Sequence, residues 1–143
     1  MELSSYFEEM EDIVPLLSIR PIHSKEIFDG RKKVELRKKV PKMISDYLLV
    51  YESSPTQEIK GLIKIKDIRC LGVNEIITRY SKKARVSPEF ISEYYKEHER
   101  GYVIEIKESF EFGSPVPLDI LREKIDFTPP QNYMYFNTSI LMD

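Results

Sequence analysis

The sequence predicts a small mixed β-barrel of about five or six strands with two to four flanking helices, an α+β chain that is mainly β. First, segments with strand-like patterns, alternating or continuously apolar, outnumber segments with helical spacing. Second, most connections between them are short and contain glycine, proline or serine. Third, so many strands in 143 residues would leave exposed edges, and curling into a closed or nearly closed barrel removes them.

The N-terminal part of the domain is expected to begin with a buried strand at residues 16–19, because three of these four residues are aliphatic. A short helix over residues 23–29 ends at Gly30, since glycine readily adopts the left-handed conformation that stops a helix. A charged strand is expected to follow Gly30, and Pro41 breaks it. Residues 47–51 are apolar throughout, which predicts a central strand.

Residues 59–68 alternate between apolar and polar side chains, which predicts a half-buried antiparallel strand. Gly61 near its start indicates a bulge or a close approach of two backbones. Helices are predicted over residues 74–83 and from residue 87 to near residue 101, since proline at position 88 favours a helix start. Alternation over residues 102–106 then predicts another strand.

Four prolines between residues 115 and 130 divide the C-terminal part into a short helix, 118–123, and a last segment, 133–137. Tyr94 and Tyr95 lie in the helix that begins at residue 87. We expect this pair to pack the helix onto the barrel rather than to stack on bases.

Charge is distributed unevenly along the chain. The net charge is −2, but residues 1–13 carry five acidic groups and no basic one, so we expect an acidic, mobile lead-in before a single domain over residues 14–143. Residues 20–42 instead carry nine lysines and arginines against three acids. This excess attracts phosphate over about 8 Å at physiological salt. Regional charge therefore favours a nucleic-acid partner.

Composition also excludes several classes of protein. No apolar run approaches the roughly 20 residues of a membrane-spanning helix, and the acidic N-terminus is unlike a secretory signal. The single cysteine, Cys70, cannot form an intramolecular disulfide, which is typical of a reducing compartment, so we expect a cytoplasmic protein. His23 and His98 lack metal-ligand spacing with Cys70, so we expect no metal site and no other cofactor.

The basic segment concentrates the candidate chemistry. Because side chains alternate along a strand, Lys33, Glu35 and Arg37 would share one face, and the aliphatic residues between them would point into the core. Gly30 lets a ligand approach the backbone closely. A charge run is most often only a solvated surface. Its place beside a helix-to-strand turn favours binding instead.

Three residues at the end of the next strand, Tyr51, Ser53 and Ser54, are expected to reach the same end of the barrel. RNA recognition commonly combines cationic contacts with stacking of bases on aromatic rings. The basic segment together with these residues therefore favours RNA or a nucleotide-like ligand as the partner.

Gly30, Lys32, Glu35 and Arg37 fit the pattern Gly-x-Lys-x-x-Glu-x-Arg of the ASCH domain family, a branch of the PUA-like barrel superfamily. The chain resembles this family in further segments, in the same order, at residues 17–21, 51–55, 59–68, 101–102 and 129–131. The resemblance implies a PUA-like β-barrel that binds RNA or modified nucleosides. Some relatives are described as regulators of transcription or translation.

The residues expected to contact RNA or a nucleotide-like ligand come from the basic segment, its flanking helix and the end of the following strand. They are Arg20, Lys25, Gly30, Lys32, Lys33, Glu35, Arg37, Lys38, Lys39, Tyr51, Ser53 and Ser54. Glu35 is expected mainly to pair with Lys32 or Arg37 and to organise them, because a carboxylate among cations stays ionised. A hydrogen bond to a base or ribose is its second possible role.

An enzyme is the alternative to a non-catalytic binding protein. In that case Lys32 and Glu35 are the candidate catalytic residues of a metal-free amidohydrolase or ribonuclease. Some relatives remove the acyl group of acetylated cytidine with a lysine, a threonine and a glutamate. Lys32 matches that lysine, but Glu35 occupies the place of the threonine, so the hydroxyl is missing. A protein-interaction role for the acidic lead-in and the oligomeric state stay open.

Overall fold

The computed structural model describes residue 10 and residues 12–43 and 45–142. Six strands form one sheet in the order β2-β5-β4-β3-β1-β6. Their bounds are β1 Ile13–Ile19, β2 Val34–Arg37, β3 Tyr47–Glu52, β4 Glu58–Gly72, β5 Arg100–Pro117 and β6 Tyr133–Asn137. The helices are α2 Pro21–Phe28, α3 Val73–Ala84, α4 Pro88–Tyr94 and α5 Leu118–Lys124, followed by the 3-10 helix η1 Thr138–Met142.

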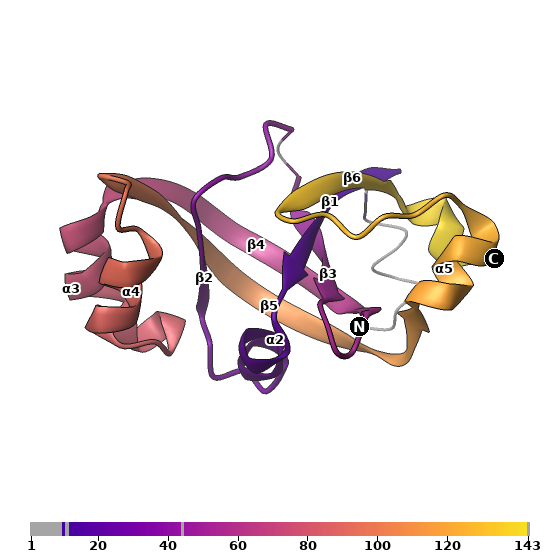
Figure 1. The fold of residues 1–143 in the computed structure, drawn as a ribbon, viewed down its shortest axis with the longest axis horizontal. Helices are drawn as coiled ribbons and strands as arrows, with labels where there is room; N and C mark the ends of the chain where they lie inside the picture. The colour runs from indigo at the N-terminus through magenta and orange to yellow at the C-terminus, as the bar shows by residue number, and fades with distance from the viewer. Residues whose placement is uncertain (1–9, 11, 44, 143) are drawn as a thin grey trace.

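Strands β4 and β5 are much longer than the others and pair along nearly their whole length. They form one curved ribbon that runs the length of the molecule, with α3 and α4 at one end and α5 and β6 at the other (Figure 1). Their register shifts between Ile59 and Gly61, between Lys64 and Ile65, and between Ile65 and Asp67. Such irregularities increase local twist, which lets a long ribbon coil around the core.

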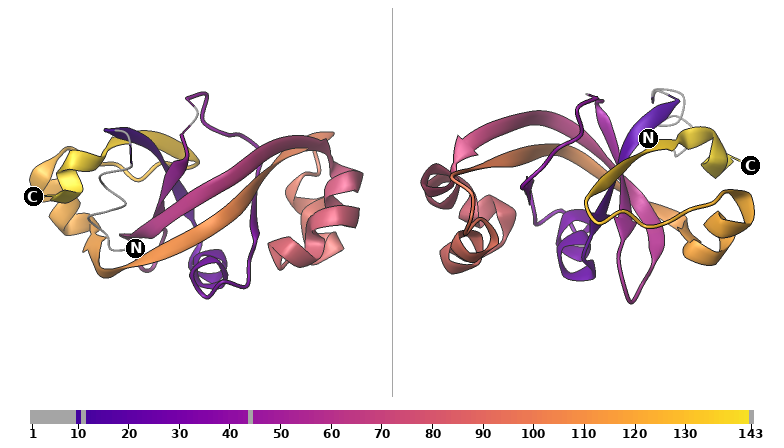
Figure 2. Two further views of the ribbon diagram at one scale, coloured as in Figure 1. Left: turned by 180° about the vertical axis from the view of Figure 1, so that it is seen from behind. Right: turned by 45° about the horizontal axis from the view of Figure 1, so that its top comes forward.

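The sheet curls but does not close. β1 pairs with β3 in parallel, and the other neighbouring strands are antiparallel. β2 and β6 are its two edges in the described part of the chain, and they stay apart in both views of Figure 2. The predicted fold is thus confirmed as mainly β and takes the form of an open barrel, with six strands and four α-helices among the residues that the structure describes.

The core consists of three clusters, because the central strands bury side chains on both faces. Leu16 packs with Leu49 in a cluster under α5, whereas Leu17 packs with Val50 in a cluster that α2 covers. Neighbouring residues of one strand point to opposite faces, so a continuous apolar run serves two clusters. The third cluster fixes α3 and α4 on the β2–β5 end of the sheet, with Tyr95 at its centre.

Two predicted boundaries differ most from the structure. β5 runs over Arg100–Pro117 instead of residues 102–106, because pairing with β4 extends it through polar residues and through two prolines. α4 ends at Tyr94 instead of near residue 101. The residues that follow, 96–100, are all charged or histidine, so they offer no apolar side chain to bury.

The predicted acidic lead-in falls mostly on residues outside the described part of the chain. Of its last residues, Met10 is buried against the cluster under α5, the Asp12 carbonyl accepts a hydrogen bond from the Thr138 amide, and Ile13 already belongs to β1. None of the helices in the described ranges combines the length and the apolar character needed to cross a bilayer.

Gly61 meets both expectations for its position. The register shifts beside it on both sides of β4, and a Cβ atom there would overlap the Phe110 carbonyl oxygen and lie 2.7 Å from Cε1 of Phe28.

We expect Gly61→Ala to lower the free energy of unfolding by about 2 kcal/mol, since overpacking forces the backbone apart. Gly113→Ala is the control, because nothing lies within 4 Å of its Cβ. Equal urea midpoints for the two variants would contradict this explanation.

Candidate functional site

A cavity of about 580 Å³ opens between β2 and the loop that precedes β6. Five segments distant in sequence supply its walls: the end of β1 with α2, the β2 strand, the β3–β4 turn, α4, and the loop 129–132. Its volume is in the range of pockets that hold small molecules. Polar and aromatic side chains from these segments therefore meet around one hollow.

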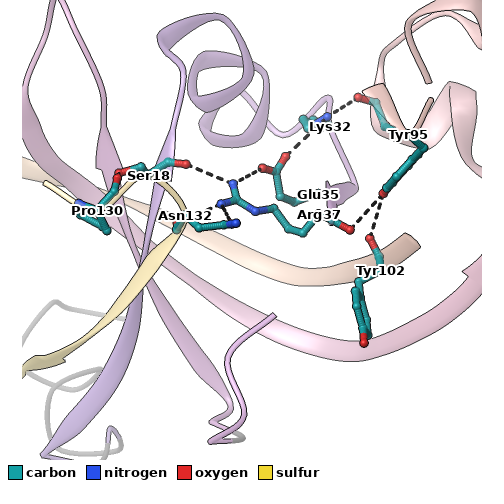
Figure 3. A network of polar contacts seen from close by, with 9 residues as sticks. Ser18, Lys32, Glu35, Arg37, Tyr95, Tyr102, Pro130 and Asn132 are labelled. Atoms are coloured by element: carbon teal, nitrogen blue, oxygen red, sulfur yellow. Dashed lines mark hydrogen bonds and ion pairs between the residues drawn. The ribbon is translucent and has the colours of Figure 1, made fainter. Parts of the chain in front are cut away.

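Arg37 connects three of these segments (Figure 3). Its Nη1 donates to the Ser18 carbonyl on β1 at 3.1 Å and to Glu35 Oε2 at 3.3 Å. Its Nη2 donates to the carbonyl and to Oδ1 of Asn132 at 2.9 and 2.7 Å. Ser18 in turn donates to the Pro130 carbonyl at 2.6 Å. The guanidinium thus joins β2, one edge of the open sheet, to the residue that directly precedes β6, the other edge.

Lys32 and Glu35 complete this buried network, which we call the Lys32–Glu35–Arg37 cluster. Lys32 Nζ lies 3.7 Å from Glu35 Oε1 and donates to the Ala84 carbonyl at the end of α3. Burial lowers the pKa of Lys32, and the neighbouring Glu35 carboxylate opposes that effect. All three side chains are less than a tenth exposed, yet they line the cavity. The predicted pairing of Glu35 with Lys32 or Arg37 is confirmed, and the carboxylate pairs with both at once.

The contacts of Arg37 decide what it can do for a ligand. Its two terminal nitrogens donate to four acceptors from three different residues, which holds the planar group in one orientation. We therefore interpret Arg37 as a positioning residue that fixes Glu35 and Asn132. Exposed cations at the cavity rim, Arg20 and Lys38, are better placed to meet a phosphate.

His23 lines the same cavity from α2. Burial lowers its pKa from the ordinary 6.5, and the positive charges of Lys32 and Arg20 act in the same direction, while Glu35 opposes them. Its ring meets that of Phe90 edge to face, with centroids 5.7 Å apart. Neutral imidazole is therefore favoured at pH 7, a form that can accept a proton.

One wall of the cavity is aromatic. Phe90 and Tyr94 of α4 are nearly parallel, with centroids 6.1 Å apart and 10° between planes, and Lys38 Nζ lies 4.7 Å from the Tyr94 centroid. Tyr51 also lines the cavity, but it is only 1% exposed and packs against Phe127. The aromatic surface open to a ligand is therefore on α4. The expected packing of Tyr94 on its helix is present, since Tyr94 contacts the third core cluster, and its ring also lines the cavity.

The predicted binding residues divide into two groups. Eight line the cavity: Arg20, Lys32, Glu35, Arg37, Lys38, Tyr51, Ser53 and Ser54. Four lie outside its lining: Lys25, Gly30, Lys33 and Lys39.

The prediction that Lys33 shares the face of Glu35 is wrong. The strand β2 begins only at Val34, so alternation does not extend back to Lys33, which is exposed. Lys25 pairs instead with Asp29 at 3.4 Å.

Sequence reasoning missed Ser18, Asn132, Phe90 and Tyr94 as lining residues. Asn132 follows two prolines and precedes a strand, which would have indicated a rigid loop able to present its amide. Phe90 and Tyr94 are four residues apart, so they share a helix face, but that spacing alone also fits a buried one. Among the described residues, no group of three or more histidine, cysteine or acidic side chains could hold a metal ion.

The family model of the ASCH domain matches residues 17–112. The ASCH domain-containing ribonuclease of Zymomonas mobilis is 27% identical over 119 residues, which cover 82% of this chain and 80% of that protein. The crystal structure of ASCH from Zymomonas mobilis has a TM-score of 0.81 at 25% identity and covers 90% of each chain. A mutant of that protein gives 0.82 at 23% identity, over 90% of this chain and 93% of the other.

Arg37→Lys tests the role of the guanidinium in joining the sheet edges. A lysine keeps the charge but cannot reach Ser18, Glu35 and Asn132 together, so we expect a loss of about 3 kcal/mol in the free energy of unfolding. Arg79→Lys is the matched control, because Arg79 pairs with Glu75 on an exposed helix face and such pairs contribute at most about 1 kcal/mol. Similar losses in urea denaturation would contradict the assigned role.

The lowered pKa of His23 predicts how stability depends on pH. Folding disfavours protonation of this imidazole, so its contribution to stability is complete above pH 6.5 and is lost as pH falls through the folded-state pKa. The stability of the wild type relative to His23→Gln should therefore decrease between about pH 7.5 and pH 5. Urea denaturation at several pH values measures this difference, and a constant or rising difference would refute the prediction.

Proposed function

The chain belongs to the ASCH domain family, and from this premise we propose that it binds RNA, with one nucleotide of a single strand held in the cavity. The observation that supports RNA binding is the lining of the cavity. Buried charges, exposed cations, side-chain amides and aromatic rings all line the same cavity. RNA-binding proteins recognise splayed-out bases through stacking and through hydrogen bonds to base edges, and they hold the backbone with cations.

Different parts of the cavity suit different parts of a nucleotide. Lys38 and Arg20 are exposed at its rim, where phosphate stays partly hydrated. Glu35 is fixed by two cations but keeps acceptor capacity, because a carboxylate offers about four lone-pair positions. It can therefore accept a hydrogen bond from a base or a ribose hydroxyl. The Asn132 side chain and its neighbour Gln131 add amide groups.

The name of the Zymomonas mobilis relative supports RNA as the ligand class. A regulatory role in transcription or translation, which the resemblance implies, would be one consequence of RNA binding. The cytoplasm is the compartment that we propose for it. Hydrolysis of an acylated cytidine is implied by the resemblance alone. We do not include it in the proposed function, because Glu35 occupies the position where that activity uses a hydroxyl.

Binding should depend steeply on salt and on the rim cations. We expect the double variant Arg20→Ala, Lys38→Ala to weaken binding of all single-stranded RNA sequences and to reduce the slope of log affinity against log salt by about 1.4, since each phosphate contact contributes about 0.7. Fluorescence anisotropy with a panel of short labelled RNAs measures both effects.

The control for this experiment is Lys66→Ala, Lys107→Ala, which removes two exposed cations outside the cavity lining. It should leave the slope nearly unchanged. Absence of any binding to the wild type at low salt would overturn the proposed function. Equal slopes for the two double variants would show that Arg20 and Lys38 do not contact the RNA phosphates.

RNA cleavage is a second candidate, favoured by the combination of His23 and Lys32, both with lowered pKa, in one cavity. In the proposed step the ribose 2′-oxygen attacks the adjacent phosphorus while neutral His23 takes its proton. The bond to the 5′-oxygen breaks, and that oxygen receives a proton from the Lys32 ammonium. The products are a 2′,3′-cyclic phosphate and a 5′-hydroxyl end. Positive charge nearby stabilises the phosphorane.

The cleavage candidate is tested with a DNA oligonucleotide that contains a single ribonucleotide. We expect wild-type protein to cut only beside that ribonucleotide and His23→Ala to cut at least about 100-fold more slowly, the usual contribution of general acid–base catalysis. His98→Ala is the control, because His98 is exposed and outside the cavity lining. Equal rates for the two variants, or no cleavage at all, would leave a binding protein without this activity.

A further inference from the structure

We propose that Phe90 and Tyr94 of α4 form a stacking platform for an unpaired base, so that the ligand of this cavity is single-stranded RNA read at one extruded nucleotide. The inference rests on the proposed function and deepens it, because it assigns the surface that distinguishes an unpaired base from a base in a duplex. Neither ring belongs to the family pattern or to the basic segment identified in the sequence.

The exposure of the platform is the first argument. Phe90 is 41% exposed, among the more exposed large apolar side chains in the described part of the chain, and it faces the cavity instead of being covered. Tyr94 is half-buried beside it with its ring 10° from parallel. Because the two rings lie side by side on the wall of a cavity, a ligand in that cavity can cover their apolar surface, and its removal from water would be favourable.

The platform is held rigidly, which is the second argument. The Ser87 hydroxyl caps α4 by accepting a hydrogen bond from the amide of Phe90 itself, at 3.0 Å. The next residue after Tyr94 is Tyr95, which is 1% exposed and whose hydroxyl donates to the Arg37 carbonyl at 3.2 Å. Gly101 admits the Tyr95 ring, since a Cβ there would overlap it. Tyr95, which follows the platform directly, thus ties the end of α4 to the strand that carries the buried cluster (Figure 3).

Charge complementarity is the third argument and identifies the occupant. Lys38 Nζ lies 4.7 Å from the Tyr94 centroid, next to the ring and exposed to solvent. A base on the platform would therefore have a cation close by for the phosphate that follows it. This combination of ring and cation matches single-stranded nucleic acid. A paired base is already stacked between its neighbours, so a duplex cannot use the platform without extruding a nucleotide.

The platform can be tested with a short single-stranded RNA that carries 2-aminopurine at each position in turn, and with the same RNA made abasic at each position. In the wild type, one position should show fluorescence quenching on binding, and the abasic change there should weaken affinity about 5- to 150-fold, the range for stacking of one base. Phe90→Leu keeps an apolar side chain but removes the ring. It should lose both the quenching and most of the abasic effect.

Ile120→Leu is the control variant, because Ile120 is an apolar residue with 38% exposure outside the cavity lining. It should behave as the wild type does. If RNA binds but neither the abasic changes nor Phe90→Leu alter its affinity, the platform is overturned and the proposed function stands. If no RNA binds the wild type at low salt, the proposed function is overturned together with the platform. Tighter binding of a fully paired duplex than of the single strand would also overturn the platform.

Discussion

The guanidinium of Arg37 is the group on which the shape of the site depends. β2 and β6 are the edges of an open sheet, and in the described residues side-chain contacts join β2 to the chain before β6. Arg37 reaches Ser18 on β1 and Asn132, the residue directly before β6, and it also holds Glu35. A planar fork with five donors can satisfy these acceptors together, which a lysine cannot do.

The buried cluster gives the cavity a polar floor with a fixed charge pattern. Two cations and one carboxylate lie at less than a tenth exposure, and burying charges is unfavourable unless they are paired. Here Glu35 pairs with both cations, and Lys32 also meets the carbonyl end of α3, where the helix dipole is negative. The cluster itself therefore carries one positive charge in excess. A floor of this kind suits an anionic ligand and orients it.

The open barrel explains why the aromatic wall and the cations face one hollow. Closure would have paired β2 with β6 and filled the space that the loop 129–132 and α4 now border. α4 is positioned by packing on the β2–β5 end of the sheet, and its rings line the same cavity as that loop. The buried cluster can orient a ligand, the rim supplies exposed positive charge, and the α4 wall offers apolar surface. Each part comes from a different element.

The sequence by itself determined the strand-rich fold, the positions of most elements, the packing constraint at Gly61 and the grouping of Lys32, Glu35 and Arg37. These features follow from local alternation, from turn residues and from one short motif, which are all visible within a few residues. Only the tertiary structure decided which cations are buried in pairs within the protein and which are exposed at the cavity rim. It also brought Asn132 to Arg37 across 95 residues and the Ala84 carbonyl to Lys32 across 52. Contacts over such separations depend on how the sheet curls, and no local pattern encodes them.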